Sequence, residues 1–409
     1  MYKILEGMRV VEGASFIAAP SCCLYLAQLG AEVIRFDMIG GGPDYTRWPV
    51  ADNGASYYWE GLNKGKKSVA INLTTEAGRE LAQEIVTAPG SQAGMFVTNY
   101  SDTGFLAHEK LVSRREDLIT VRVMGWADGR NAVDYTINAV TGIPLMTGPN
   151  SIEADEPVNH VLPAWDLLTG SYAAFALMAA ERNRQLTGRG EEVKIPLSDI
   201  AAASLGHVGQ IAETMIGNGD RPRIQNDLYG SLGRDFRTRD GQSIIIVSIT
   251  KRQWMELVRS LGIEAVVTSL ESELGVSFLH EGERYKHRAR LCEVIQAEVC
   301  ARTYKELEVL FGKTAVCWSA YKTLSDAIET EQGFVSGNPI FSEVFHPSGS
   351  TYPTPGAAGT FSFSERVAPS RAPLIGENTD EVLAEVLALS SNQIGTLHDQ
   401  GIVAGPSKR

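Results

Sequence analysis

The sequence has few cysteines and lacks the short motifs of common metal and redox sites. Its five cysteines include the adjacent pair Cys22 and Cys23, and no two are spaced as CxxC. An odd number without that spacing predicts reduced cysteines that pack in the interior, with a reactive thiol as the less favoured interpretation. The seven histidines show no HExxH spacing, so we expect no metal site.

Positive charge and long apolar runs are also scarce. The formal net charge of the 409 residues is −12, so we expect no nucleic-acid partner, although a local basic patch could still hold an anionic ligand. No stretch reaches about 18 uninterrupted apolar residues, so we expect no membrane span. Residues 1–6 lack the apolar core of a signal peptide, and the cysteines are predicted to be reduced, so we expect a cytoplasmic protein.

Three familiar signatures for nucleotides and acyl groups are missing as well. The turn after the first predicted strand, residues 12–20, lacks the second and third glycines of GxGxxG, so a bound nicotinamide dinucleotide is not expected. The sequence contains no GxxxxGK[ST] phosphate-binding loop and no GxSxG turn that would carry a nucleophilic serine.

The sequence does contain a regular alternation of strand and helix patterns. Short apolar strands separated by helical periodicity predict an open α/β sheet with parallel strands. The predicted strands are 8–12, 31–37, 68–73, 95–98, 119–124, 192–197 and 243–247. The predicted helices are 20–30, 75–87, 167–186, 198–217, 251–262, 283–301 and 378–389, with a polar tail after the last one.

Changes in composition divide the chain into a large domain interrupted by a smaller α/β domain. Linkers on both sides of a small domain are unusual for a compact monomer, which suggests that the chain spreads over another subunit. The predicted parts are 1–217 (large domain), 218–242 (linker), 243–332 (small domain), 333–372 (Pro/Gly/Ser-rich extended linker) and 373–409 (return to the large domain).

Asp166 is the best single candidate for chemistry. It stands alone in the otherwise apolar run 162–170, directly before the small-residue helix pattern 171–180. A carboxylate with apolar neighbours loses hydration, so its pKa and nucleophilicity respond to whatever docks beside it. The competing interpretation is a helix N-cap, because Asp is common at that position. The residues alone leave both interpretations open.

Two basic features are candidates for binding phosphate. Residues 63–67, Asn-Lys-Gly-Lys-Lys, place three ammonium groups around one glycine in an otherwise acidic protein. Arg47, next to Trp48, is a similar candidate. The alternative for both is an ordinary solvated basic loop.

Taken in order, several segments resemble the class III CoA-transferases. The matching blocks are 5–12, 26–37, 63–69, 187–191 and 373–383, together with Asp44, Arg47 and Asp166. The resemblance implies a Rossmann-like large domain interrupted by a smaller one, and two chains interlocked as a homodimer. It also implies an acyl-CoA thioester substrate, and no separate cofactor because CoA is part of that substrate.

The resemblance further implies that Asp166 is the nucleophile, through a mixed anhydride and an aspartyl-CoA thioester. It is strongest to a branch that moves CoA between the two carboxyls of one mesaconate molecule. Residues 36–49 carry that likeness, supported by Glu12-Gly13 and 61–66. The alternatives are transfer to a different acid, and a CoA-binding protein without catalysis. The intact block around Asp166 argues against the latter.

The resemblance also implies CoA contacts by position. Some basic family positions hold other side chains here, and Arg35 and Arg47 are expected to compensate. The implied contacts are Phe16 and Ile17 near the thioester, Ile71 near the adenine, and Asn99, Met124, Lys66 and Lys67.

Two segments depart from patterns found elsewhere among these proteins. Residues 226–235 contain no run of glycines, which fits a less mobile cover over the anhydride. Residues 125–134 contain no histidine, so the α-proton abstraction used by the related racemases is not expected.

Overall fold

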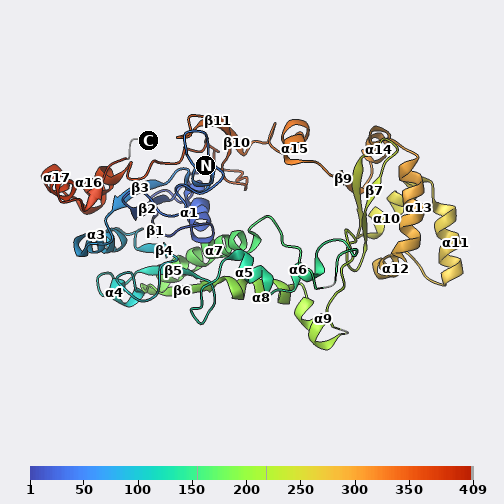
Figure 1. Ribbon diagram of the computed structural model, residues 1–409, viewed down its shortest axis with the longest axis horizontal. Helices are drawn as coiled ribbons and strands as arrows, with labels where there is room; N and C mark the ends of the chain where they lie inside the picture. Colours follow the sequence, from blue (N-terminus) through green and yellow to red (C-terminus); the bar gives the residue numbers. More distant parts are fainter. Residues whose placement is uncertain (154, 218, 407–409) are drawn as a thin grey trace. The chain divides into compact units, whose positions relative to one another are not determined.

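The computed structural model describes residues 1–153, 155–217 and 219–406 (Figure 1). The chain forms two compact units. The first contains residues 1–141, 161–212 and 337–409, and the second contains 142–160 and 213–336. These boundaries differ from those expected, because 142–160 belongs with the second unit and 337–372 with the first. The start of the predicted linker, residue 218, and the chain end, 407–409, lie outside the described residues.

The first unit is built on a seven-stranded sheet in the order β12-β3-β2-β1-β4-β5-β6. All neighbouring pairs are parallel except β12 with β3, so the predicted α/β class and parallel sheet are confirmed, with one antiparallel edge added. The strands are β1 (Arg9–Gly13), β2 (Glu32–Met38), β3 (Lys67–Ile71), β4 (Met95–Thr98), β5 (Ile119–Met124), β6 (Glu192–Pro196) and β12 (Val403–Ala404).

The strand order reverses at β1, which lies between β2 and β4. In open parallel sheets, ligands bind beyond the carboxyl ends of the strands at such a reversal. Residues 14–17 follow β1, Asn99 follows β4, and Met124 ends β5. The fold therefore brings several of the expected CoA contacts to this edge of the sheet.

Helices cover both faces of this sheet. Helices α1 (Ala18–Gln28) and α7 (Ala164–Thr187) pack against one another on one face (Figure 1). On the other face, α3 (Glu76–Thr87), α16 (Thr379–Leu387) and α17 (Ser391–Asp399) enclose an apolar core. The shorter helices are α2 (Tyr57–Asn63), α4 (His108–Val112), α5 (Asp134–Ala139) and α8 (Leu197–His207).

Gly170 allows α7 to approach α1 closely. A Cβ at this position would lie 2.0 Å from Ser21 Oγ and 2.6 Å from the carbonyl oxygen of Ala18. Both helices begin at the carboxyl edge of the sheet, because α1 follows β1 and α7 leads into the parallel strand β6. Asp166 lies one turn before Gly170, so this packing places it near the beginning of α1.

Three expectations for the first unit need correction. The helix expected over 198–217 is interrupted at Gly209, whose φ of +79° is left-handed, and α9 (Gln210–Ile216) follows. The extended linker 333–372 contains an antiparallel hairpin of β10 (Phe341–Phe345) and β11 (Thr351–Pro355). The polar tail contains α17 and β12, where Ile394 and Val403 supply the buried contacts.

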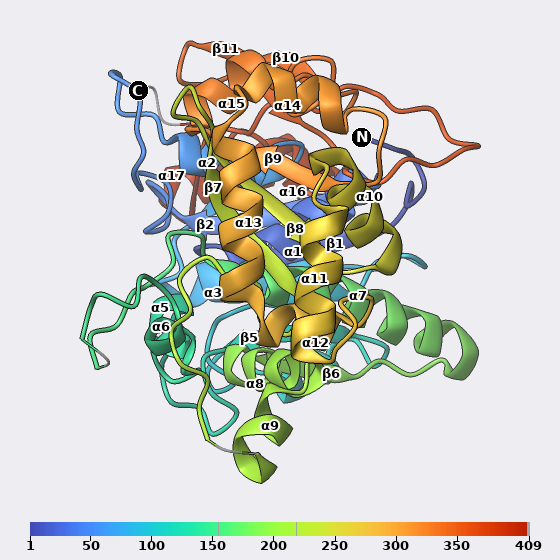
Figure 2. The same cartoon turned by 90° about the vertical axis from the view of Figure 1, so that its right-hand side faces the viewer.

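The second unit has a three-stranded antiparallel sheet in the order β7-β8-β9, with helix α13 lying across it (Figure 2). Strand β7 falls in the segment expected to be a linker, because Gly and charged residues hide its two core positions, Leu232 and Phe236. The second unit contains α6 (Ile143–Met146), β7 (Leu232–Arg237), β8 (Ser243–Ser248), α10 (Lys251–Leu261), α11 (Glu264–Leu274), α12 (Glu281–Lys286), α13 (Arg288–Cys300), α14 (Tyr304–Phe311), β9 (Cys317–Ala320) and α15 (Leu324–Thr330). Among the described residues, no helix is both long and apolar enough to cross a membrane.

Candidate active site

Asp166 lies in the first turn of α7, as the third residue of the helix, and is partly buried. The N-cap position is held by Pro163, and no side chain of α7 caps its own helix start. The interpretation of Asp166 as an ordinary N-cap is therefore wrong. Its carboxylate is not occupied in closing the helix, and this leaves it available for chemistry.

Another carboxylate caps this helix. Oδ2 of the buried Asp134 accepts hydrogen bonds from the backbone N–H of Trp165 at 2.7 Å and of Asp166 at 3.0 Å. One turn later on α5, Asn138 Oδ1 accepts the indole N–H of Trp165 at 3.1 Å. The i, i+4 pair Asp134 and Asn138 thus lies on one face of α5 and fixes the beginning of α7.

The environment raises the pKa of Asp166 from its ordinary value of 3.8 to about 7. Burial is the largest cause, because a desolvated carboxylate favours its neutral form. The nearby Asp134 charge acts in the same direction, and the positive charge of Arg47 opposes both. A carboxylate poised near neutral pH and short of solvent is a stronger nucleophile than one exposed to water.

The loop after β1 carries Phe16 and Ile17 toward the same edge. Phe16 has a left-handed backbone with φ of +73°, and its N–H donates to Asp44 Oδ2 at 3.3 Å. Asn99 holds the preceding residue from both sides, since its Oδ1 accepts from Ser15 N–H at 3.2 Å and its Nδ2 donates to Ser15 C=O at 2.9 Å. The loop is therefore fixed at the reversal of strand order, where a thioester is expected.

Arg47 is an exposed cation beside this loop. Its guanidinium carbon lies 5.5 Å from the ring centroid of Phe16 and 5.3 Å from that of Tyr58. Within the described parts of the chain, its side chain forms no ion pair and no hydrogen bond with another side chain. The two aromatic faces hold the guanidinium while leaving its donors available.

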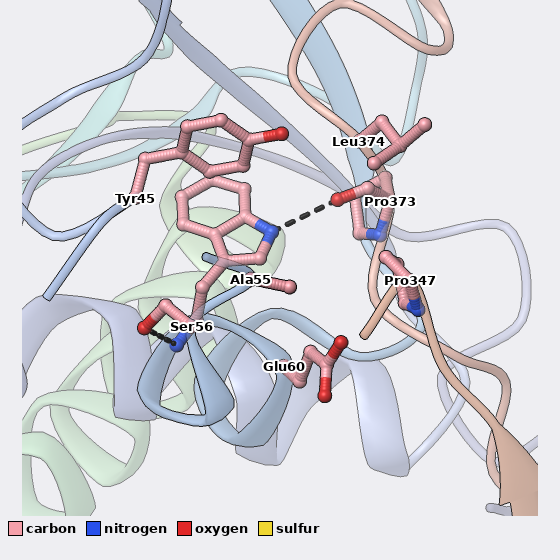
Figure 3. A pocket seen from close by; sticks show the side chains of 8 residues that line it. Tyr45, Ala55, Ser56, Glu60, Pro347, Pro373 and Leu374 are labelled. Carbon is pink, nitrogen blue, oxygen red and sulfur yellow. Dashed lines mark hydrogen bonds between the residues drawn. The ribbon is translucent and has the colours of Figure 1, made fainter. Parts of the chain in front are cut away.

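Tyr58 comes from α2, which is fixed on both sides. Ser56 caps α2 by accepting the N–H of Trp59, and the Trp59 indole donates to Pro373 C=O at 2.9 Å (Figure 3). Glu60 accepts from Ser348 N–H at 2.6 Å. The small pocket drawn there is lined by Tyr45, Ala55, Ser56, Trp59, Glu60, Pro347, Pro373 and Leu374. Asp166 is not among these residues, so we regard this pocket as part of the support for α2.

Arg35 and Lys66 are buried cations that are already neutralised. Arg35 donates to Asp37 at 2.8 Å, to Glu12 at 3.0 Å and to Asp44 at 3.0 Å, and its guanidinium lies over Trp59. Lys66 Nζ lies 2.7 Å from Glu12 Oε2 and donates to Pro20 C=O at 2.9 Å. Their burial does not favour the expected contacts with CoA phosphates.

The other residues expected to contact CoA differ in how exposed their side chains are. The side chain of Ile71 is fully buried in the core between the sheet and α3, which does not favour contact with adenine. Lys67 Nζ lies within 3.2 Å of three carboxylates, those of Glu32, Glu381 and Glu385. Met124 is partly exposed at the end of β5, so it remains placed for contact with a ligand. Among the described residues, no three His, Cys, Asp or Glu side chains gather in a way that could hold a metal ion.

Three residues that surround Asp166 were not predicted from the sequence. Asp134, Asn138 and Tyr58 were not singled out, although all three influence the surroundings of Asp166. The i, i+4 spacing of Asp134 and Asn138 was an available signal for one polar helix face. Nothing local indicated that this face meets the start of α7.

Comparison with known proteins defines the class. Residues 5–379 match CoA-transferase family III. A CAIB/BAIF family protein from Brucella suis has the same fold, with a TM-score of 0.76 and 24% identity over 94% of this chain and 100% of that one. The chain belongs to CoA-transferase family III, and the predicted family and its enzymatic nature are confirmed.

Two relatives within the family differ in their identity to this chain. The 2-methylfumaryl-CoA isomerase of Chloroflexus aurantiacus is 46% identical over 409 residues, which is 100% of both chains. The succinyl-CoA:glutarate CoA-transferase of Homo sapiens is 26% identical over 415 residues, covering 98% of this chain and 90% of the relative.

Proposed function

We propose that this protein moves CoA from one carboxyl of mesaconate to the other, converting 2-methylfumaryl-CoA into 3-methylfumaryl-CoA. The observation that carries the proposal is the carboxylate of Asp166, which has a pKa of about 7 and lies at the carboxyl edge of the sheet. The full-length similarity to 2-methylfumaryl-CoA isomerase supports the choice of substrate.

A carboxylate of the protein is needed for this reaction. The two carboxyls of a trans-configured diacid lie on opposite sides of a double bond and cannot react with one another. Asp166 attacks the thioester carbonyl, which gives a mixed anhydride and CoA thiolate. The thiolate then attacks the Asp166 carbonyl, which gives an aspartyl-CoA thioester and the free diacid.

The second half of the reaction reverses these steps at the other end of the diacid. The other carboxylate attacks the aspartyl-CoA carbonyl, forming a second anhydride and releasing the thiolate. The thiolate attacks the diacid carbonyl, and Asp166 leaves as a carboxylate. No net proton and no electron is gained or lost, so the reaction requires no redox group.

Retention of the diacid makes the transfer intramolecular. A diacid that stays beside the aspartyl-CoA thioester presents its second carboxylate at a high effective concentration. Exclusion of water also protects the anhydride from hydrolysis. We assign the CoA contacts that fit the structure to Phe16, Ile17, Asn99 and Met124, all at the carboxyl edge.

Transfer to a different acid is the second candidate. The 26% identity to succinyl-CoA:glutarate CoA-transferase favours it, since that name describes transfer between two acids. Incubation with unlabelled 2-methylfumaryl-CoA and labelled free mesaconate separates the two functions. We expect the product thioester to form without label. Substantial label in the product would contradict the intramolecular transfer and support exchange with free acids.

We also propose that the protein works in the cytoplasm as an interlocked homodimer. Large apolar side chains are exposed on α7, with Phe175 at 67% and Leu186 at 68% exposure, and a second chain would cover surface of this kind. Sedimentation equilibrium tests the assembly. A dimer that does not dissociate on dilution is expected, and a monomer at working concentration would contradict it.

A further inference from the structure

Three arginine and lysine side chains near the reaction edge differ in how their charge is balanced. Arg35 and Lys66 are buried and paired with carboxylates. Arg47 is exposed, and over the described residues no carboxylate lies within ion-pair distance of its side chain. It is therefore the cation of this group that can take an anionic partner from outside the chain.

The structure also holds Arg47 in place. Its carbonyl oxygen accepts the hydroxyl of Ser56, the residue that caps α2, and its backbone N–H donates to Asp44 C=O at 3.3 Å. The rings of Phe16 and Tyr58 lie beside its guanidinium. Phe16 is fixed in turn by Asp44. An arginine held in this way loses little conformational entropy when it binds a carboxylate.

Arg47 is also electrostatically coupled to the nucleophile. Its charge lowers the pKa of Asp166 against the larger effects of burial and Asp134. The two side chains are nonetheless not paired, since no ion pair joins them. A guanidinium that lies near the attacking carboxylate, beside Phe16 and not bound in an ion pair, is free to contact an acyl group that docks at Asp166.

We propose that Arg47 binds the free carboxylate of the acyl group while Asp166 reacts with the other end, and so selects thioesters of dicarboxylic acids. This inference rests on the proposed function. In the first half of the reaction Arg47 holds one carboxylate, and in the second half it holds the carboxylate that has just been released. A planar guanidinium can accept either end through two parallel hydrogen bonds.

A phosphate of CoA is the competing ligand for Arg47. The two ligands can be separated because tiglyl-CoA carries the same CoA but has a methyl group where 2-methylfumaryl-CoA has its free carboxylate. If Arg47 binds a phosphate, its loss weakens both thioesters equally. If it binds the acyl carboxylate, its loss weakens only 2-methylfumaryl-CoA.

The test is a binding measurement in a chain that cannot react. Calorimetry compares Asp166→Asn with the double variant Asp166→Asn/Arg47→Gln, using each thioester. We expect the Kd of 2-methylfumaryl-CoA to rise about 10- to 100-fold, which is typical for the loss of a charge-assisted hydrogen-bonded pair, and the Kd of tiglyl-CoA to change less than about threefold. Arg9→Gln in the same background is the matched control, because it removes the same charge from the amino end of β1.

Equal weakening of both thioesters, or no weakening of either, would overturn the role of Arg47. Turnover of 2-methylfumaryl-CoA by the unaltered protein is measured separately. Absence of turnover together with selective weakening would reject the proposed function and keep Arg47 as a carboxylate-binding residue. Turnover together with equal weakening would reject Arg47 and keep the function.

Discussion

The side chain of Asp134 binds the backbone of Asp166: its Oδ2 accepts the N–H of Asp166 at 3.0 Å. One carboxylate therefore closes the start of α7, which is the task that the sequence suggested for the other. The Asp166 carboxylate is left unencumbered, and the charge of Asp134 helps to raise its pKa. We regard Asp134 as a positioning residue, because it holds the backbone of Asp166 and acts on its carboxylate by charge.

The pH dependence of catalysis follows from the pKa of Asp166. Only the ionised carboxylate attacks the thioester, so kcat/KM should rise about tenfold per pH unit below pH 7 and level off above it. Asp134→Asn removes a neighbouring negative charge, so the midpoint of this curve should move to lower pH. Initial rates between pH 5 and 9 test both statements. A midpoint that stays in place in the variant would show that Asp134 does not influence the nucleophile.

Removing the cap should weaken the beginning of α7. Asp134→Ala leaves two backbone N–H groups without their acceptor, which typically costs about 0.5–2 kcal/mol of unfolding free energy. Asp134→Asn keeps one acceptor and should cost less. Urea unfolding at pH 8 measures the difference. Equal stability of Asp134→Ala and the unaltered protein would mean that the contact does not stabilise the helix.

Asp166 should destabilise the fold at the pH where it works. Its pKa is higher in the folded than in the unfolded chain, so the folded state binds the proton more tightly and stability falls as pH rises from about 4 to 7. Asp166→Asn removes this effect. The variant should be more stable than the unaltered protein above pH 7, by at most about 4 kcal/mol because the carboxyl is only partly buried, and nearly equal to it at pH 4. Thermal unfolding at pH 4 and pH 8 gives the comparison, and an equal difference at both values would contradict it.

The ring of Tyr58 should matter more than its hydroxyl for holding Arg47. Tyr58→Phe keeps the aromatic face 5.3 Å from the guanidinium, whereas Tyr58→Leu removes it. We expect KM for 2-methylfumaryl-CoA to rise several-fold in Tyr58→Leu and to stay within about twofold in Tyr58→Phe, because a cation–π contact contributes about 0.5–2 kcal/mol. Steady-state kinetics at pH 9, where Asp166 is ionised in every variant, provides the test. An equal rise of KM in both variants would assign the role to the hydroxyl.

Much of the sheet could be predicted because its strands are short apolar runs. The predicted bounds of β4 and β5 agree with the structure, as expected for parallel strands buried on both faces. Helices α11 and α17 were missed because few of their residues are buried, Val267 and Leu270 in α11 and Ile394 in α17. Such elements gain their stability from contacts with distant segments, which a local pattern does not contain.

The candidate site could be predicted only in part, because some of its residues depend on contacts between distant segments. Asp166 stood out because its charge contrasts with its neighbours in the sequence. The sequence did not indicate that Arg35, which was expected to contact CoA, pairs with Glu12, the residue directly opposite it in the register of β1 and β2. The cap from Asp134 depends on the approach of α5 to α7, which no spacing in the sequence encodes.

The most direct test of the account is to follow oxygen into Asp166. 2-Methylfumaryl-CoA is prepared with ¹⁸O in its free carboxylate, turned over by the unaltered protein, and the peptide that carries Asp166 is examined by tandem mass spectrometry. The second anhydride joins that oxygen to the Asp166 carbonyl, and attack of the thiolate on the diacid leaves it there. We predict ¹⁸O in the side chain of Asp166 after turnover, and complete product formation without ¹⁸O at Asp166 would contradict the role of this carboxylate as the nucleophile.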